Sequence, residues 1–475
     1  MDAITKELDG IELGDKRLNR RSQLVLQGLS VDTQASINGS FGSWAETHAA
    51  YRLFDNPQVT PEAILEPHYS ATHERIRRCP VVLIVQDTTE YDFSKHPPRD
   101  AACLTKPNRL GFYDHTHLAL TPEGLALGLV GSETFDRTPE SLGSTKDRSK
   151  IAIEEKESFR WLQGFRLAHQ ISCEYPQTRI VSVADCEADI YDIFLEAQIR
   201  CDDPISPTTD YVIRSKENRL LNERIPPREH NSRCAVYRKL RDVTRQAPVL
   251  FRKVIELPET PKRTSRSATL EVRARQVTFH HPKNRRGLAE VTCNVVYVQE
   301  IGPQQPSPEL KSDDNTLIEW WLLTSLPATT PAEVEQIIDY YKARWTIEVY
   351  FRMLKTGCRV EQIQLETVAR MKNCLAFYRI IAWYVLCLTH FNRHAPDEPC
   401  TQAFADWQWQ PVWRITTRKP LPSQPPTLGT LVLLLARLGG YNNRPNERPP
   451  GPQPIWVGLR RMHDFALALQ TFYPP

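Results

Sequence analysis

Two short apolar runs, each ending in an aspartate, constrain the fold of this chain more than any other feature. VVLIVQD (81–87) and RIVSVAD (179–185) are rich in β-branched residues. Such continuous runs are typical of central strands buried on both faces of a parallel sheet. HLALTPEGLALGLV (117–130) predicts a β-hairpin, residues 152–170 predict a helix, and CEADIYDIFLEAQI predicts another helix after the second strand. The order strand, hairpin, helix, strand, helix is that of a ribonuclease-H-like α/β core, although the pattern alone leaves other α/β folds open.

The segments around this core predict helical regions and a β-rich insertion. Residues 1–75 read as helices with basic residues near the front, as expected of a DNA reader or of a packing cap. Residues 205–318 alternate like strands, and WWLLTS (320–325) predicts one more strand. Past a buried apolar helix at 371–390, a Pro-, Trp- and Gln-rich linker at 395–427 precedes a last helical segment.

Charge is distributed unevenly along the 475 residues. The net charge of the chain is only +3, but residues 233–286 hold fifteen Lys or Arg against four acids. This basic island indicates a polyanionic partner such as nucleic acid, or simply a solvated basic surface. The eleven cysteines form no C-x-x-C pair, and the N-terminus lacks the pattern of a signal peptide. We therefore expect a cytoplasmic protein with reduced thiols and no membrane segment.

A stripe of polar residues marks the helix that the sequence predicts from Pro331 to Gly357. Thr330 offers an N-cap and Glu333 completes a capping box. In YKARWTIEVYFRMLK (341–355), at about 100° per residue, Tyr341, Arg344, Glu348 and Lys355 fall within roughly 60° of one another on an ideal helix. A solvated helix face explains charged residues, but it does not explain why a carboxylate, a phenol and several cations gather on one side.

The two strand-end aspartates and Glu348 predict a metal site. Asp87 and Asp185 each end a buried strand, where α/β proteins place ligands, although a strand-end aspartate often only caps a turn. Three converging carboxylates repel one another unless they bind cations, and hard oxygen ligands suit Mg²⁺ or Mn²⁺. Two such ions can promote attack on a phosphodiester, and the neighbouring cations would hold phosphates. The sequence therefore predicts phosphoryl transfer on nucleic acid, with no organic cofactor.

These residues resemble the signature of a known family. Tyr341, Arg344, Glu348 and Lys355 match the Y-R-E-K spacing of the DDE transposases of bacterial insertion sequences, in the IS-four family. D-T-T at Asp87 and D-x-E-A-D at Asp185 resemble the other two acidic motifs of that family. GSWAETHAAYRLFDNPQVTPEAI, GFYDHTHLAL, EEKES, YVIRSK, WWLLTS and LLARLGGY are also similar, most of all to the branch of the transposon-Tn-five transposase. The resemblance spans nearly the whole chain.

The resemblance implies a cut-and-paste transposase that nicks the terminal inverted repeats, forms and reopens a hairpin, and joins the ends to target DNA. It implies that Asp87, Asp185 and Glu348 bind the metal ions and catalyse cleavage. It implies three domains of a homodimer: a helical DNA-end-binding domain at 1–75, a catalytic domain at 76–370 with the insertion at about 205–318, and a helical dimerisation domain at 371–475. The residues that would contact DNA are Tyr341, Arg344, Arg352, Lys355, Arg214, Lys216 and Trp320.

Several alternatives remain open at this stage. Trp320 matches an aromatic residue that holds a flipped base, but it can also be a core residue, and the adjacent Trp321 makes the register uncertain. Arg352 stands where relatives can carry lysine, and His115 is expected to be a buried, hydrogen-bonded histidine. A DNA-binding regulator without turnover and a metal-dependent nuclease are the alternatives to an active transposase. The intact acidic motifs argue against the regulator, because clustered acids repel DNA.

Overall fold

The chain divides into two compact units. The computed structural model describes residues 3–472 except 107, 138–151, 203–207, 227–235, 258–265, 283, 284, 286, 303–316, 445, 446 and 448. Unit 1 comprises residues 1–79, 87–145 and 346–475, and unit 2 comprises residues 80–86 and 146–345. Strand β1 (Val81–Asp92) contributes its first half to unit 2 and its second half to unit 1.

Unit 1 begins with the helices expected for residues 1–75. They are α1 (Lys16–Val31), α2 (Trp44–Phe54) and α3 (Pro61–Ile76). The side chains of Asp15, Ser43 and Thr60 cap the three N-termini, which explains where each helix begins. The helical prediction for this region is confirmed.

The sheet of unit 1 is built on the predicted hairpin. The second half of β1 lies beside β3 (Leu110–Leu120), which pairs with β4 (Ala126–Phe135) and with the short β2 (Ala102–Cys103). Helix α3 packs on β4 so closely that a Cβ at Gly128 would lie 1.9 Å from the Thr72 hydroxyl. Only glycine fits at this position, which also has a φ of +152°. The hairpin prediction is confirmed.

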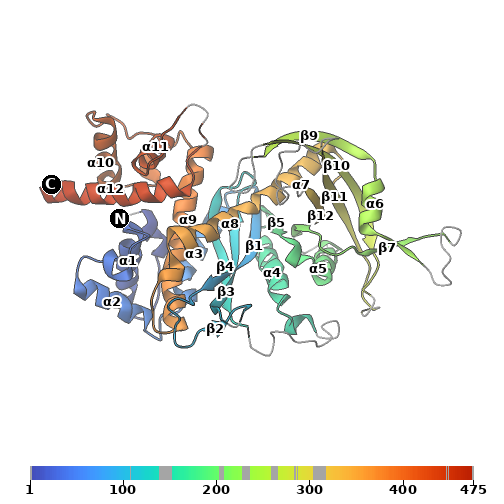
Figure 1. Cartoon of the computed structure of the whole chain (residues 1–475), viewed down its shortest axis with the longest axis horizontal. Coiled ribbons are helices and arrows are strands. Elements are labelled where there is room, and N and C mark those ends of the chain that lie inside the picture. The colour runs from blue at the N-terminus through green and yellow to red at the C-terminus, as the bar shows by residue number, and fades with distance from the viewer. Residues whose placement is uncertain are drawn as a thin grey trace. The chain divides into compact units, whose positions relative to one another are not determined.

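The remaining helices of unit 1 surround the long helix α9 (Val368–His394). They are α8 (Trp345–Arg352), α10 (Asp406–Thr417), α11 (Leu428–Leu438) and α12 (Pro452–Phe472), and α12 lies along α10 and α11 (Figure 1). Within α9, Val368–Phe391 is long and apolar enough to cross a membrane by length and composition, but 83% of its most apolar window is buried in the protein. It is therefore a core helix, as the sequence predicts.

Unit 2 contains a curved mixed sheet (Figure 1). The first half of β1 pairs in parallel with β5 (Arg179–Ala184), and β5 pairs in parallel with β6 (Asp210–Arg214). Antiparallel strands then extend the sheet in the order β12, β11, β10, with β7 and β9 both on β10 and β8 on β7. These strands are β7 (Leu220–Arg224), β8 (Tyr237–Lys239), β9 (Val249–Leu257), β10 (Arg266–Phe279), β11 (Val291–Ile301) and β12 (Glu319–Thr324).

Helices cover both faces of this sheet. Helices α4 (Phe159–Glu174), α5 (Tyr191–Asp202) and α6 (Leu240–Gln246) share one apolar core with the sheet, which includes Trp161, Phe194 and Trp321. Helix α7 (Pro331–Ala343) packs on β5, β6 and β12. Its capping box at Thr330 and Glu333 is present as predicted.

The connectivity is that of a ribonuclease-H-like fold. A first strand followed by an antiparallel hairpin, a helix, a parallel strand, a helix and a second parallel strand gives the spatial order β4, β3, β1, β5, β6. Of the insertion expected at about 205–318, β6 belongs to the parallel core, while β7 to β11 extend the sheet with antiparallel strands.

Two predicted elements are wrong in detail. The single helix expected from Pro331 to Gly357 is interrupted at Arg344 and ends in a π-helical turn, Met353–Gly357, so the ideal stripe does not hold over its whole length. The linker expected at 395–427 contains α10, because Trp409 and Val412 bury an apolar face.

Candidate functional site

Tyr341, at the end of α7, is the centre of a cluster in unit 2. Its side chain is buried, and its ring meets Trp320 edge to face with 5.4 Å between centroids. The Arg344 guanidinium lies 5.7 Å from the centroid of the same ring. Burial raises the pKa of the Tyr341 hydroxyl, while Arg344 and Arg214 lower it and Asp185 raises it. Three predicted DNA contacts, Trp320, Arg344 and Arg214, are therefore gathered around the Tyr341 phenol, and the predicted metal ligand Asp185 is close enough to affect its pKa.

Strand β12 separates its two tryptophans onto opposite faces. Trp321 is 5% exposed, stacks on Tyr297 at 4.7 Å, and donates from Nε1 to the Thr244 hydroxyl at 2.9 Å. Trp320 is half-buried and faces Tyr341 instead. Of the two candidates, Trp321 is a core residue and Trp320 belongs to the cluster.

Asp185 and Asp189 stand at the two ends of one short turn. Asp185 follows β5 directly, and its carboxylate accepts a hydrogen bond from the Glu187 amide at 2.8 Å. The helix expected from residue 186 starts as a single 3₁₀ turn, Cys186–Ala188, for which Asp189 is the C-cap residue. The Asp185 side chain is half-buried, as a residue that caps a turn or holds an ion at a sheet edge would be.

Asp189 organises the loop that carries the predicted DNA contacts of β6. Its carboxylate is buried and accepts from the backbone amides of Lys216 and Glu217, each at 2.7 Å. The Ser215 hydroxyl also donates to it at 3.2 Å. The Arg219 guanidinium pairs with it at 2.5 Å and lies over the Phe194 and Phe279 rings. No local pattern predicts this role of Asp189, the last acid of D-x-E-A-D, because its partners are more than twenty residues away along the chain.

Arg214 and Lys216 are exposed at the end of β6, on the same side as Asp185. Burial and Asp185 raise the pKa of the Cys186 thiol, and both cations lower it, so both act close to that turn. Arg241 supports the loop from α6 by donating to the Lys216 carbonyl at 3.0 Å. The backbone that carries the two cations is therefore fixed, while their side chains face solvent.

The prediction that a strand ends at Asp87 is wrong, because β1 continues to Asp92 where its second half joins the sheet of unit 1. Asp87 lies at the end of the buried apolar run of β1 and belongs to unit 1. Its carboxylate accepts from the Thr88 amide at 2.8 Å, and the Thr88 hydroxyl shares a hydrogen bond of 2.8 Å with Nδ1 of His115. His115 is 1% exposed. The expectation of a buried, hydrogen-bonded histidine is confirmed.

The other residues of the Y-R-E-K motif lie in unit 1 on α8 and the π-helical turn. Ile347, Tyr350 and Leu354 are buried, and they fix the segment to the unit 1 core. Glu348 is half-buried and Arg352 is exposed. The Lys355 ammonium lies 5.8 Å from the centroid of the Tyr91 ring.

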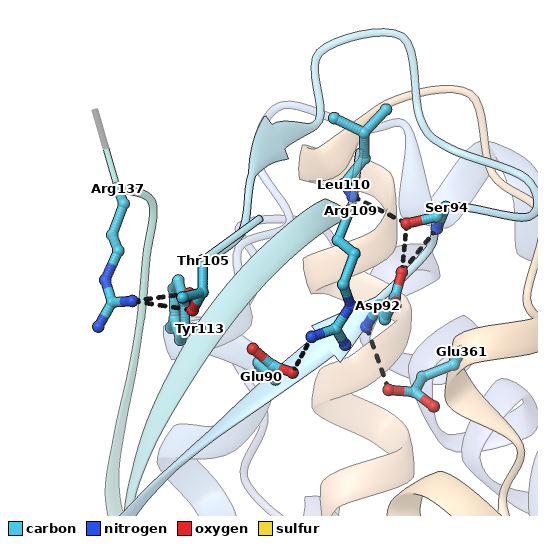
Figure 2. A network of polar contacts seen from close by, with 9 residues as sticks. All are labelled: Glu90, Asp92, Ser94, Thr105, Arg109, Leu110, Tyr113, Arg137 and Glu361. Atoms are coloured by element: carbon cyan, nitrogen blue, oxygen red, sulfur yellow. Dashed lines mark hydrogen bonds and ion pairs between the residues drawn. The ribbon is translucent and has the colours of Figure 1, made fainter. Parts of the chain in front are cut away.

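Further acids on β1 and after the π-helical turn are held by a polar network (Figure 2). Arg109 pairs with Glu90 at 2.6 Å and with Asp92 at 2.8 Å. Glu361 accepts from the Asp92 amide at 3.1 Å. Burial raises the pKa of Asp92, but the hydrogen bonds from Ser94 and Arg109 outweigh it and the net shift is downward. Arg109 thus joins two carboxylates of β1 in one network.

The basic island of unit 2 is largely neutralised by ion pairs. Arg275 pairs with Glu223 at 2.8 Å and Arg245 with Glu319 at 3.0 Å, and both acids lie outside residues 233–286. The other paired cations are Arg252, Lys253, Arg266, Arg273 and Arg285. Residues 233–235, 258–265, 283, 284 and 286 of the island lie outside the described residues. Among the described residues of the island, most of the positive charge that the sequence shows is therefore paired with acids.

The predicted metal ligands are divided between the units. Asp87 and Glu348 belong to unit 1 and Asp185 to unit 2. Among the described residues, no group of three or more His, Cys, Asp or Glu side chains is placed to hold a metal ion. All three carboxylates are half-buried oxygen donors, the type of ligand that Mg²⁺ or Mn²⁺ takes.

Comparisons with known proteins give three family matches in chain order. "Transposase DNA-binding" matches residues 1–59, "Transposase DDE domain" matches residues 206–384, and "Transposase Tn5 dimerisation domain" matches residues 380–470. The DDE match includes Glu348 and begins after Asp185. Among solved structures, a cryo-EM structure of a piggyBac transposase synaptic complex with hairpin DNA is similar with a TM-score of 0.35 and 10% identity, over 81% of this chain and 71% of that one.

The matches agree with the ribonuclease-H-like connectivity and with the motifs of the sequence. A DDE domain is a catalytic domain that depends on divalent metal ions, and here it is flanked by matches to DNA-binding and dimerisation domains. The chain therefore belongs to the DDE transposases of the Tn5 and IS4 type.

Proposed function

We propose that this transposase moves DNA by a cut-and-paste reaction in which Asp87, Asp185 and Glu348 hold two divalent ions, Mg²⁺ or Mn²⁺. When bound, such ions would activate a water or a 3′-hydroxyl and stabilise the leaving oxygen of a phosphodiester. The protein residues would hold the ions, position the DNA strand and keep the scissile phosphate in line.

The strand register supports the pairing of the two aspartates. In the parallel ladder of β1 and β5, Val85 is opposite Val183. Asp87 and Asp185 each follow two residues after this last pair of the ladder. Neighbouring strands lie about 4.8 Å apart, and residues of equal register point to the same face. Two carboxylates at such positions suit a shared ion.

The Tyr341 cluster is the observation that carries the proposal. It collects the Arg344 and Arg214 guanidinium groups and the Trp320 ring around the Tyr341 phenol, whose pKa Asp185 also affects. Arginine binds phosphate oxygens through paired N–H groups, and a phenol can donate to them. An aromatic ring beside them can stack on a base that leaves the helix.

We assign the remaining predicted contacts on the same chemistry. Tyr341, Arg344, Arg352 and Lys355 contact phosphates near the scissile bond. Arg214 and Lys216 contact the DNA end from the loop after β6. Trp320 holds a flipped base while the freed 3′-hydroxyl forms a hairpin, which is then reopened and joined to target DNA.

The domains divide the work as the family matches suggest. We propose that the region 1–75 binds the terminal inverted repeats, that 76–370 carries the chemistry with its insertion at about 205–318, and that 371–475 joins two copies in a DNA-bound homodimer. The protein would act in the cytoplasm, on the nucleoid.

Strand transfer is the experiment that tests this function. The full-length protein is incubated with Mg²⁺ and a duplex that carries the inverted repeat flanking its gene, and products are separated on a denaturing gel. Nicked, hairpinned and joined products are expected. Binding without cleavage would indicate a regulator, and cleavage with neither hairpins nor joined ends would indicate a nuclease.

A further inference from the structure

The N-terminal helices expose a tryptophan beside a hollow that the site described above does not use. Trp44, at the start of α2, is 79% exposed, the largest exposed fraction among the large hydrophobic residues of the described chain. Tryptophan is enriched at interaction surfaces, because its ring offers a large apolar face and one polar N–H group. His48 stacks on the indole with 4.9 Å between ring centroids and 16° between planes. One face of the ring is therefore braced, and the ring stays presented to solvent.

The hollow beside Trp44 has a volume of about 420 Å³. This size is within the range of about 300–1,000 Å³ that small-ligand pockets occupy. We call it the Trp44 hollow, and its lining includes Asn38, Phe41, Trp44, Thr47, His48 and Tyr51.

Contacts with α1 and within the lining itself hold the residues of the Trp44 hollow in place. The Phe41 ring packs against Gly28 of α1 so closely that a Cβ there would lie 2.5 Å from it. The Tyr51 hydroxyl donates to the Asn38 side-chain oxygen at 3.1 Å. A hollow that is formed before its ligand arrives binds with a smaller loss of conformational entropy.

The lining combines a flat ring on which a ligand can stack with polar groups that can form hydrogen bonds to the edge of that ligand. The indole offers a flat apolar face, while an amide, hydroxyls and an imidazole offer donors and acceptors. Proteins that bind unstacked bases use this combination of aromatic stacking and hydrogen bonds to the base edge. A nucleobase fits it better than an aliphatic peptide side chain, which has no polar edge.

Charge favours DNA as the source of that base. Helices α1 and α2, which pack together, carry five cations against one acid, Glu46. The cations are Lys16, Arg17, Arg20, Arg21 and Arg52. The two helices together would attract phosphates, although the one acid, Glu46, lies beside Gly42 of the lining.

We propose that the Trp44 hollow binds an unstacked nucleobase of the transposon end and thereby contributes to end-sequence recognition. This inference rests on the proposed function, since it takes the terminal repeat as the ligand. It assigns a base-reading role to a site separate from the Tyr341 cluster.

The test is an abasic scan of end binding with the full-length protein. A set of duplexes of the terminal repeat, each with one base removed, is titrated with the wild type, Trp44→Ala and Trp44→Phe. For the intact duplex, Trp44→Ala should bind about 5- to 150-fold more weakly, the range expected for one lost base stack. Trp44→Phe should keep most of the affinity.

The scan also locates the base. One abasic position should weaken the wild type by a similar factor and leave Trp44→Ala unchanged, because the stack is already absent in that variant. Leu24→Ala, which truncates an exposed side chain of α1 outside the hollow, is the matched control and should bind as the wild type does.

The inference is overturned if Trp44→Ala binds like the wild type, or if both proteins lose affinity at the same abasic positions. If the wild type cleaves the end with Mg²⁺ and either result is found, only the inference falls. If the wild type neither binds nor cleaves the end, the proposed function falls and this inference falls with it.

Discussion

Asp189 and Arg219 form a charge pair in unit 2 whose closest oxygen–nitrogen distance is 2.5 Å, with the aspartate side chain only 1% exposed. The same carboxylate accepts hydrogen bonds from the backbone amides of Lys216 and Glu217. Asp189, which is four residues after the predicted metal ligand Asp185, thus holds the loop that presents Arg214 and Lys216.

Asp189→Ala should therefore lower both stability and end binding. Removing one partner of a buried ion pair leaves Arg219 uncompensated, which costs about 3–5 kcal/mol of unfolding free energy. Chemical denaturation measures this loss, and anisotropy with the end duplex measures binding. Glu217→Ala is the matched control, because it keeps the backbone amide that Asp189 binds. Equal effects of the two substitutions would show that Asp189 does not organise the loop.

Trp321→Ala and Trp320→Ala should fail in different ways. Trp321 is a core residue, so its truncation should cost about 3–5 kcal/mol of stability. Trp320→Ala should keep the fold, end binding and first-strand nicking but reduce hairpin formation by about 5- to 150-fold, the value of one base stack. Trp320→Phe should restore part of the hairpin yield. Normal hairpin formation by Trp320→Ala would remove the base-holding role from this residue.

The salt dependence of end binding should separate phosphate contacts from ion-paired cations. Arg214→Ala and Lys216→Ala should each reduce the slope of log affinity against log salt by about 0.9. Arg275→Ala is the control, since this arginine is already paired with Glu223 at 2.8 Å. If all three substitutions change the slope equally, the ion pairs of the basic island give way to DNA and our distinction is wrong.

Acid should weaken unit 1 through His68. Burial lowers the pKa of His68, and its Nε2 accepts from the Leu129 amide at 3.0 Å while Nδ1 meets Glu7 at 2.6 Å. Protonation would place a hydrogen on Nε2. Nε2 could then no longer accept the hydrogen bond from the Leu129 amide, and two donors would face each other. Because the folded-state pKa lies below 6.5, this stabilisation is complete above about pH 6.5 and is lost as the pH falls toward the folded value.

The comparison of wild type with His68→Gln checks this pH dependence. The denaturation midpoint of the wild type should drop between about pH 8 and about pH 5, and that drop should be smaller in the variant. Burial raises the pKa of Glu7, but His68 and Arg75 outweigh this effect and the net shift is downward. Glu7 therefore loses its contribution to stability only at still lower pH. Parallel pH curves for the two proteins would contradict the assignment to His68.

Much of the fold could be predicted from local patterns. The two buried strands, the hairpin and the N-terminal helices follow from continuous apolar runs, turn residues and caps, although β1 continues past Asp87 to Asp92. Such signals are local, so a sequence carries them intact. The Y-R-E-K spacing likewise identified the segment that holds Tyr341 and Glu348.

The remaining features depend on residues that are distant in sequence. The break at Arg344 and the π-helical turn change the angles that an ideal helix assumes, and no Gly or Pro announces the break. The island of positive charge is neutralised by acids such as Glu223 and Glu319, which lie outside the window that was counted. The role of Asp189 appears only when β6 returns beside the turn after β5.

Substitution of Glu348 tests most directly whether this residue completes the catalytic triad with Asp87 and Asp185. Glu348→Gln removes one negative charge from the predicted metal site and keeps the size of the side chain. End nicking by this variant is measured with Mg²⁺ and with Mn²⁺, beside end binding without metal. Glu335→Gln, which changes an exposed glutamate of α7, is the matched control. We expect Glu348→Gln to bind the end like the wild type and to lose nicking by at least about 10³-fold, on the scale seen when one catalytic group is removed, while the control cuts normally. Normal nicking by Glu348→Gln would contradict the claim that Glu348 completes the catalytic triad with Asp87 and Asp185.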